Sequence, residues 1–167
     1  MIGLFLNLLD TQSEKDKFIK LYDKYKNMLY WISYGKTQSC QDAEECVAET
    51  FFYVAKHFEK IGDVNSSKTK GYLATIVTGF SIDVFNKSKK YGLIDIENNN
   101  VAENLSYFDN IETVELSSAI ESVLSEEEKI YIYLKYVYGY KSAEIAEIYN
   151  VTDISVRKKL ERAKAKL

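Results

Sequence analysis

The clearest candidates for functional residues lie in the last stretch of the chain, from Val151 to Leu167. This stretch holds six basic and two acidic residues, although the formal net charge of the whole chain is −3. Basic side chains gathered on one helix are typical of proteins that bind the phosphates and base edges of DNA. The chemistry indicated is therefore nucleic-acid binding. The candidate DNA-contacting residues, which include both arginines of the chain, are Ser155, Arg157, Lys158, Lys159 and Arg162.

The sequence does not indicate an enzyme or a metal site. It has a single histidine, His57, and Val54 stands where a Glu-x-x-His metal-binding pair would need a glutamate. It also has no glycine-rich phosphate-binding loop and no Ser/His/Asp or Cys/His arrangement. We therefore expect no enzymatic activity, no metal and no cofactor.

Two further features predict where the protein works. Cys40 and Cys46 are separated by five residues, which is neither a zinc spacing nor a disulfide framework. We therefore expect free thiols in a reducing compartment. The apolar first ten residues are too short to span a bilayer and lack the basic start of a signal peptide. The prediction is a cytoplasmic protein that does not bind membranes.

The element that positions the basic residues is a predicted helix-turn-helix between Ser142 and Leu167. Ser142 is expected to cap the first helix, Asn150 to end it in the left-handed conformation, and Thr152 to cap the second helix. A basic amphipathic helix can also be an ordinary solvated surface helix, so this stretch alone leaves both interpretations open. The stripe expected to be buried, opposite the basic face, is Val156, Leu160, Ala163 and Leu167.

The rest of the sequence also predicts helices. Apolar residues recur at helical spacing, and the capping boxes Thr11–Glu14 and Ser125–Glu128 open two of these periodic stretches. Gly35 and Gly139 are placed to terminate helices. The predicted helices cover about 13–34, 42–60, 69–90, 111–123 and 125–138.

The segment 91–110 interrupts the helical pattern. It is acidic, contains three consecutive asparagines and has no apolar periodicity, so we expect a linker. The fold class predicted is all-α, with two small helical domains over residues 1–90 and 111–167. The polar loop 61–70, which contains glycine and serine, is expected to be mobile.

Helix 42–60 carries acidic and aromatic residues on the face opposite its predicted buried stripe. Acidic residues near a helix N-terminus favour the helix dipole, which gives part of the charge a purely structural explanation. An outward-facing aromatic among carboxylates also indicates a protein interface, with partial burial as the alternative. The residues of this face include Asp42, Glu45, Glu49 and Phe52.

The order of these pieces resembles the small RNA-polymerase sigma factors of the extracytoplasmic-function type, over nearly the whole chain. The run Asp42–Phe51 resembles the region-two helix of that family. The run Tyr72–Val77 is similar to the segment that opens its minus-ten recognition helix. Three further segments resemble region four, namely Leu124–Glu128, Glu144–Ala146 and Val156–Leu167.

The resemblance implies a sigma factor that binds core RNA polymerase and directs it to promoter DNA. The loop 61–70 and the helix after it would hold the minus-ten strand, and the basic residues of 151–167 would read the minus-thirty-five element. An anti-sigma factor is implied as a further partner, although no residue here identifies it. The polymerase-binding residues would be Asp42, Glu45, Glu49 and Phe52. The minus-ten residues would be Lys68, Lys70, Tyr72 and Lys87.

The chain departs from the family pattern within the minus-ten helix. Thr78 and Gly79 stand where the family usually has Arg-Asn, and Asn86 stands where an Arg is expected. Two cationic contacts to the minus-ten region are therefore missing, and nearby lysines lack the planar fork of arginine. Melting strength and minus-ten sequence preference thus do not follow from the resemblance.

The alternative function is a stand-alone helix-turn-helix transcriptional regulator. Such a regulator should bind duplex DNA by itself, usually as a dimer, whereas a sigma factor should require polymerase. This alternative leaves the run Asp42–Phe51 and the N-terminal helices without a purpose. We therefore prefer the sigma-factor hypothesis.

Overall fold

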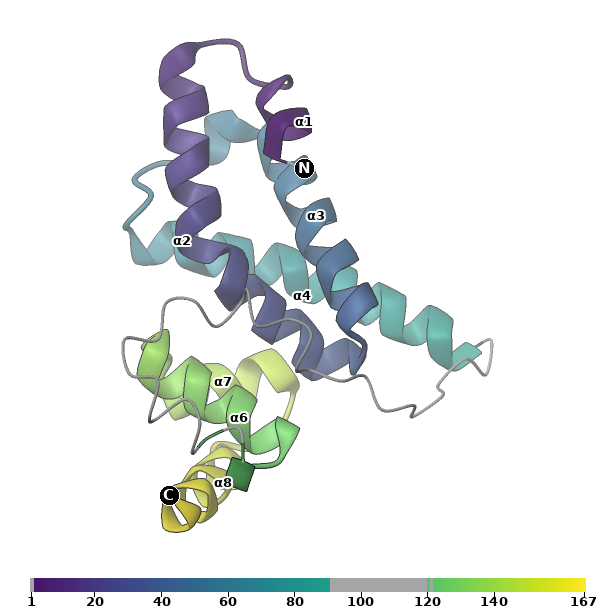
Figure 1. Ribbon diagram of the computed structural model, residues 1–167, viewed down its shortest axis with the longest axis vertical. Coiled ribbons are helices and arrows are strands. Elements are labelled where there is room, and N and C mark those ends of the chain that lie inside the picture. The colour runs from purple at the N-terminus through teal and green to yellow at the C-terminus, as the bar shows by residue number, and fades with distance from the viewer. Residues whose placement is uncertain (1, 91–119, 121) are drawn as a thin grey trace. The chain divides into compact units, whose positions relative to one another are not determined.

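The computed structural model describes residues 2–90, 120 and 122–167, and all regular structure in these ranges is helical (Figure 1). The all-α prediction is thus confirmed. The chain divides into two compact units, Met1–Asn100 and Val101–Leu167. The predicted linker 91–110, and most of the helix predicted over 111–123, lie outside the described residues. The domain boundaries drawn from the sequence therefore stay predictions.

The N-terminal unit is a cluster of three long helices with a short one at its start. In Figure 1, α4 crosses behind α2 and α3, and each of these three helices contacts the other two. The short α1 packs against both α2 and α3. The elements are α1 (Ile2–Leu6), α2 (Gln12–Thr37), α3 (Cys40–Lys56), the 3-10 turn η1 (Phe58–Lys60) and α4 (Ser67–Lys90).

Phe51 of α3 lies at the centre of the core of this unit and is 0% exposed. Its ring centroid lies 4.7 Å from that of Tyr22, 6.0 Å from that of Phe18 and 6.5 Å from that of Phe5. The aromatic side chains of α1, α2 and α3 therefore meet at one residue. The stripe predicted for this helix is buried throughout, at Ala43, Val47, Phe51, Val54 and Phe58.

The C-terminal unit contains the predicted helix-turn-helix. Gly139 separates the first helical stretch from the pair that follows, with φ 72, which confirms its predicted role. Both α6 and α7 pack against α8. The elements are α6 (Glu126–Ile132), the π-helical turn η3 (Tyr133–Val137), α7 (Ser142–Tyr149) and α8 (Asp153–Lys166).

Several helix ends follow the predicted capping chemistry. The Thr11 hydroxyl accepts the Glu14 amide at 3.1 Å, and the Glu14 carboxylate accepts the Thr11 amide at 3.2 Å. Ser125 and Glu128 form the same reciprocal pair. Asn150 has φ 53, as expected for a left-handed C-cap, and the Thr152 hydroxyl accepts the Ser155 amide at 3.2 Å. These predictions are confirmed.

Three predicted helix ends were wrong. Gly35 lies inside α2, because glycine tolerates helical geometry and the helix ends where Gln38 adopts φ 56. Ser142 is the first residue of α7 and Lys141 is its N-cap, whose amide donates to Glu144 at 2.7 Å. The helix predicted from residue 42 begins at Cys40, because the preceding serine, Ser39, supplies the N-cap.

The buried stripe of α8 is shorter than predicted. Val156, Leu160 and Ala163 are buried, but Leu167 is 51% exposed. Leu167 follows the last helical residue, so the helix no longer holds its side chain on the inner face. No helix among the described residues is both long and apolar enough to cross a membrane.

Replacing Phe51 with alanine should lower the free energy of unfolding of the N-terminal unit by about 3–5 kcal/mol, because it leaves a cavity where three aromatic residues meet. The single tryptophan of the chain, Trp31, lies in α2, so urea unfolding can be followed by its fluorescence. Phe52→Ala is the matched control, because Phe52 is 40% exposed, and it should change stability by less than about 1 kcal/mol. Equal losses in the two variants would contradict this account of the core.

Candidate functional site

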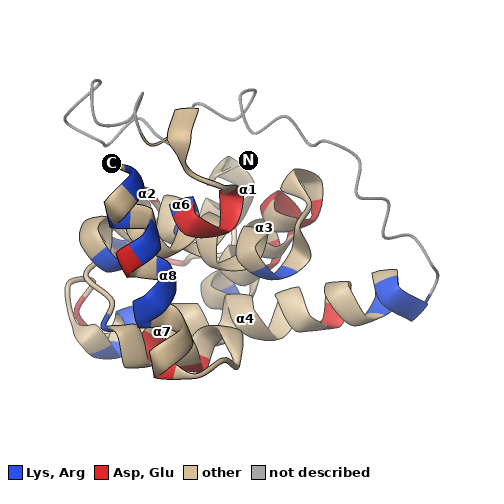
Figure 2. Cartoon of the chain, turned by 90° about the horizontal axis from the view of Figure 1, so that it is seen from below, with Lys and Arg blue, Asp and Glu red and all other residues tan. Residues whose placement is uncertain are grey.

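The outward face of α8 forms a shallow hollow that contains most of the predicted minus-thirty-five residues. Lys158 and Arg162 are exposed and stand one turn apart, with Ser155 one turn before Lys158. None of the described residues that line the hollow is acidic. In Figure 2 the basic residues appear as blue segments along this helix. The residues lining the hollow are Thr152, Ile154, Ser155, Lys158, Lys159 and Arg162.

Lys159 is engaged within the protein although it lines the same hollow. Its Nζ forms an ion pair with Glu127 of α6 and lies 5.3 Å from the centroid of the Tyr131 ring. The prediction that Lys159 belongs to the DNA-contacting face did not include these contacts, because Glu127 is 32 residues away in the sequence. Another ion pair joins the same two helices, since Lys166 Nζ lies 2.8 Å from the Glu128 carboxylate. These pairs anchor α8 to the start of α6.

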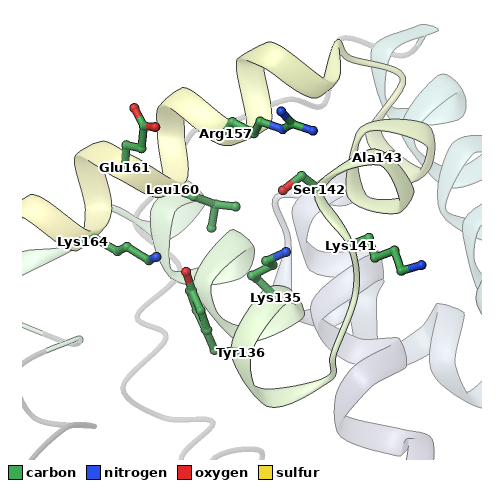
Figure 3. A pocket seen from close by; sticks show the side chains of 9 residues that line it. All are labelled: Lys135, Tyr136, Lys141, Ser142, Ala143, Arg157, Leu160, Glu161 and Lys164. Atoms are coloured by element: carbon green, nitrogen blue, oxygen red, sulfur yellow. The ribbon is translucent and has the colours of Figure 1, made fainter.

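Arg157 lies on a different side of α8, next to a groove between α8 and the η3–α7 connection (Figure 3). Its Nη2 is 2.8 Å from Asp153 Oδ2, and its side chain remains 67% exposed. Lys164 Nζ lies 5.0 Å from the centroid of the Tyr136 ring at the other end of the groove. The groove is lined by Lys135, Tyr136, Lys141, Ser142, Ala143, Arg157, Leu160, Glu161 and Lys164.

The sequence analysis missed the basic character of this groove. Among the described residues that line it, four are cationic and one, Glu161, is acidic. Lys135 and Lys141 come from segments that precede the helix pair, and nothing in their local spacing connects them with α8. The groove therefore adds a second basic surface to the C-terminal unit.

The acidic face of α3 is arranged as predicted. Glu45 and Glu49 are exposed, and Asp42 in the first turn is half-buried. Phe52 is partly exposed beside them, with Lys56 Nζ 4.2 Å from its ring centroid. This face lies opposite the buried stripe of the same helix.

The four predicted minus-ten residues do not form one site. Lys68, Lys70 and Tyr72 lie in the first turns of α4, whereas Lys87 lies near its end with two more lysines. At 1.5 Å per residue, Lys68 and Lys87 are about 28 Å apart along the helix. Gly79 lies between them on the exposed side, and nothing within 4 Å occupies the space of its missing Cβ.

The loop before α4, expected to be mobile, is tied to α2 by hydrogen bonds. Lys17 Nζ donates to the Ile61 carbonyl at 2.7 Å, and the Tyr25 hydroxyl donates to the Val64 carbonyl at 2.6 Å. The composition of the loop did not indicate these contacts with the helix beneath it, and the expected mobility of the loop stays a prediction.

No group of three or more His, Cys, Asp or Glu side chains within the described ranges could hold a metal ion. Cys40 and Cys46 are free thiols. Burial raises the pKa of the Cys46 thiol. The candidate functional features of the described residues are therefore charged and aromatic surfaces.

Comparison with known families matches both units. Residues 21–91 match sigma-70 region 2, and residues 115–167 match sigma-70 region 4. The chain is also 25% identical, over 169 aligned positions, to the ECF RNA polymerase sigma factor SigW of Bacillus subtilis (strain 168), an alignment that covers 93% of this chain and 89% of that protein.

The region 2 match takes in most of α2 and all of α3 and α4, which the hypothesis of a stand-alone regulator left without a purpose. The region 4 match contains the whole helix-turn-helix. Neither region is that of an enzyme. The chain therefore belongs to the sigma-70 family and is a sigma factor with regions 2 and 4.

Proposed function

We propose that the protein binds core RNA polymerase through the acidic face of α3 and recognises promoters through α8 and the start of α4. The observation that carries this proposal is the contrast between two exposed surfaces on different helices. The face of α3 presents Glu45 and Glu49 beside a partly exposed aromatic ring, and that of α8 presents Lys158 and Arg162. A protein that joins a polymerase to DNA needs one surface for each partner.

For the minus-thirty-five element, the proposed readers are Lys158, Arg162 and Ser155. Arg162 can present its planar fork to a guanine or a phosphate, and Lys158 can supply a point charge. Arg157 and the other basic residues of the groove are proposed to contact phosphates at the flank, because such contacts position a helix in the major groove. Lys159 is left out of the proposed readers because it is paired with Glu127.

For the minus-ten element, we propose that loop 61–66 and the first turns of α4 hold the single strand. Lys68 supplies positive charge and Tyr72 an aromatic ring, a combination used by proteins that bind single-stranded nucleic acids. Lys70 lies between them, and Lys87 is proposed to contact DNA farther along the helix. Thr78 replaces the usual arginine and Gly79 the usual asparagine, so the minus-ten sequence preference should differ from that of sigma factors with Arg-Asn at these positions.

The proposal also includes an anti-sigma factor as a protein partner, which the family resemblance supports and to which no particular residue is assigned. It locates the protein in the cytoplasm, where polymerase and promoter DNA meet. Purification of the tagged protein with its bound proteins, followed by mass spectrometry, would test both the polymerase and this further partner.

Reversing the charges of Glu45 and Glu49 together to lysine should weaken binding to core polymerase while leaving helicity unchanged. Both side chains are exposed, so the change in stability should not exceed about 0.5 kcal/mol per site. Binding can be measured by surface capture of core polymerase, with circular dichroism as the folding check. The matched control is Asp16→Lys with Asp23→Lys, the same charge change at exposed sites of α2. Equal losses in the two double variants would point to net charge rather than this face.

Replacing Lys158 or Arg162 with alanine should weaken binding of holoenzyme to a promoter duplex selected from a random pool by the wild-type holoenzyme. If the side chain neutralises a phosphate, its removal should reduce the salt slope by about one unit. If the side chain reads a base, its removal should cost about 1–3 kcal/mol and relax preference at one position.

Lys159→Ala is the informative comparison for these variants. Because Lys159 pairs with Glu127, its removal should leave the salt slope of promoter binding unchanged and lower the stability of the C-terminal unit by less than about 1 kcal/mol. Wild-type binding by both the Lys158 and Arg162 variants across a salt series would remove this face of α8 from the promoter interface.

A further inference from the structure

The loop between η1 and α4, residues 61–66, is held by side chains of a helix far from it in the sequence. We propose that Lys17, Lys24 and Tyr25 of α2 are positioning residues that keep this loop in the shape that receives the single strand of the minus-ten element. This inference rests on the proposed function of the loop and of the start of α4. It assigns to α2 a part in promoter opening, beyond its part in the core.

Three hydrogen bonds join α2 to the loop, each from a side chain of the helix. Lys17 Nζ donates to the Ile61 carbonyl at 2.7 Å, and the Tyr25 hydroxyl donates to the Val64 carbonyl at 2.6 Å. Lys24 Nζ donates to Asn65 Oδ1 at 2.6 Å. The bonds are spread along the loop, so they fix both its first residue and its turn.

The donors are themselves held in place. Tyr25 is 3% exposed, so its ring is packed in the core. This packing holds the hydroxyl in position to donate to the loop. Lys17 Nζ lies 5.3 Å from the centroid of the Phe58 ring, directly before the loop. Lys24 is more exposed, and its Nζ lies 5.5 Å from the centroid of the Tyr25 ring. This clamp, formed by Lys17, Lys24 and Tyr25, is therefore anchored in the same core that holds α2 to its neighbours.

Within the loop, a second set of bonds gathers on the carbonyl of Asp63. That oxygen accepts the Ser66 amide at 3.1 Å, the Ser66 hydroxyl at 2.9 Å and the Thr69 hydroxyl at 2.7 Å. These bonds shape the turn into α4, but they connect the loop only to itself and to the start of that helix. The bonds from α2 connect the loop directly to a second helix of the unit.

The side chains that the clamp leaves facing water are polar. Asp63, Asn65, Ser67 and Lys68 are exposed, and Lys68 opens the proposed minus-ten surface on α4. A loop that is ordered before DNA arrives avoids most of the conformational entropy that a flexible loop would lose on binding. The clamp therefore acts on affinity for the single strand through the loop, without touching DNA.

The experiment compares single-residue variants of the full chain, each assembled with core polymerase into holoenzyme. The probe is a fluorescent single-stranded DNA selected from a random pool by the wild-type holoenzyme, and binding is followed by anisotropy. Tyr25→Phe removes only the hydroxyl, and Lys17→Met removes only the ammonium donor. Each should weaken probe binding about three- to tenfold, the size expected for loss of one hydrogen bond.

Matched controls separate positioning from general effects of substitution. Tyr22→Phe removes a hydroxyl from the same helix at a ring that packs against Phe51, and Lys20→Met removes an ammonium group elsewhere on that helix. Both controls should bind the probe within about twofold of wild type, since neither residue donates a hydrogen bond to the loop. Lys17→Arg keeps a donor and should restore probe binding, which a role in bulk packing would not predict.

Two further measurements distinguish loss of the clamp from general damage to the N-terminal unit. Affinity for core polymerase should be unchanged in Tyr25→Phe and Lys17→Met, and amide hydrogen exchange should quicken across residues 61–66 while α3 keeps its protection. Equal weakening of core and probe binding would overturn the proposal, because it would mean that the whole unit had been damaged.

Lys68→Ala and Tyr72→Ala, tested in the same assay, distinguish failure of the clamp from failure of the proposed minus-ten surface. If these two variants weaken probe binding and the clamp variants do not, the positioning role is overturned and the surface stands. If none of the four variants weakens probe binding, the proposed surface is overturned and the clamp with it.

Discussion

The packing of this protein is governed by the need to bury an apolar stripe of each main helix against its neighbours. Fully burying a side chain such as Val156 or Leu160 contributes about 1.5–3 kcal/mol, whereas a charged group stays in water unless it is paired. On α8 these preferences place Val156, Leu160 and Ala163 inside and leave Lys158 and Arg162 outside. The same division on α3 buries the stripe around Phe51 and exposes Glu45 and Glu49. The basic and acidic surfaces are thus formed by the same packing that stabilises the fold.

Pairing between helices then decides which charges remain available to a partner. Lys159 and Lys166 are joined to Glu127 and Glu128 of α6, so part of the positive charge of α8 is used to hold the helix in place. Exposed ion pairs of this kind add little stability, and their main effect here is to occupy the charges of Lys159 and Lys166. The aromatic ring of Tyr131, also in α6, makes a further contact with the Lys159 ammonium group. The basic face that remains available to a partner is narrower than the basic composition of the helix suggests.

The N-terminal unit shows the same relation between core and surface. α2 buries one side among the aromatic residues around Phe51 and, from Lys17 to Tyr25, reaches the loop before α4 with polar groups. Anchoring the loop to a helix of the core gives a polar segment a defined shape that its own composition does not supply. The sigma-70 region 2 match begins at Leu21 and includes Tyr25, the loop and the acidic face of α3, so these features lie within one unit of the family.

The amino-acid sequence was enough to predict most of the helices and their caps, the buried stripes and the acidic and basic faces. These features depend on residues three or four positions apart, such as Thr11 with Glu14 or Val156 with Leu160. The ion pair of Lys159 with Glu127, 32 residues away, and the hydrogen bond from Tyr25 to the Val64 carbonyl, 39 residues away, were set instead by the tertiary structure. It also decided that Lys135, Lys141 and Lys164 share a groove with Arg157. Such contacts depend on which helices cross and at what angle, and spacing within one helix carries no information about that crossing.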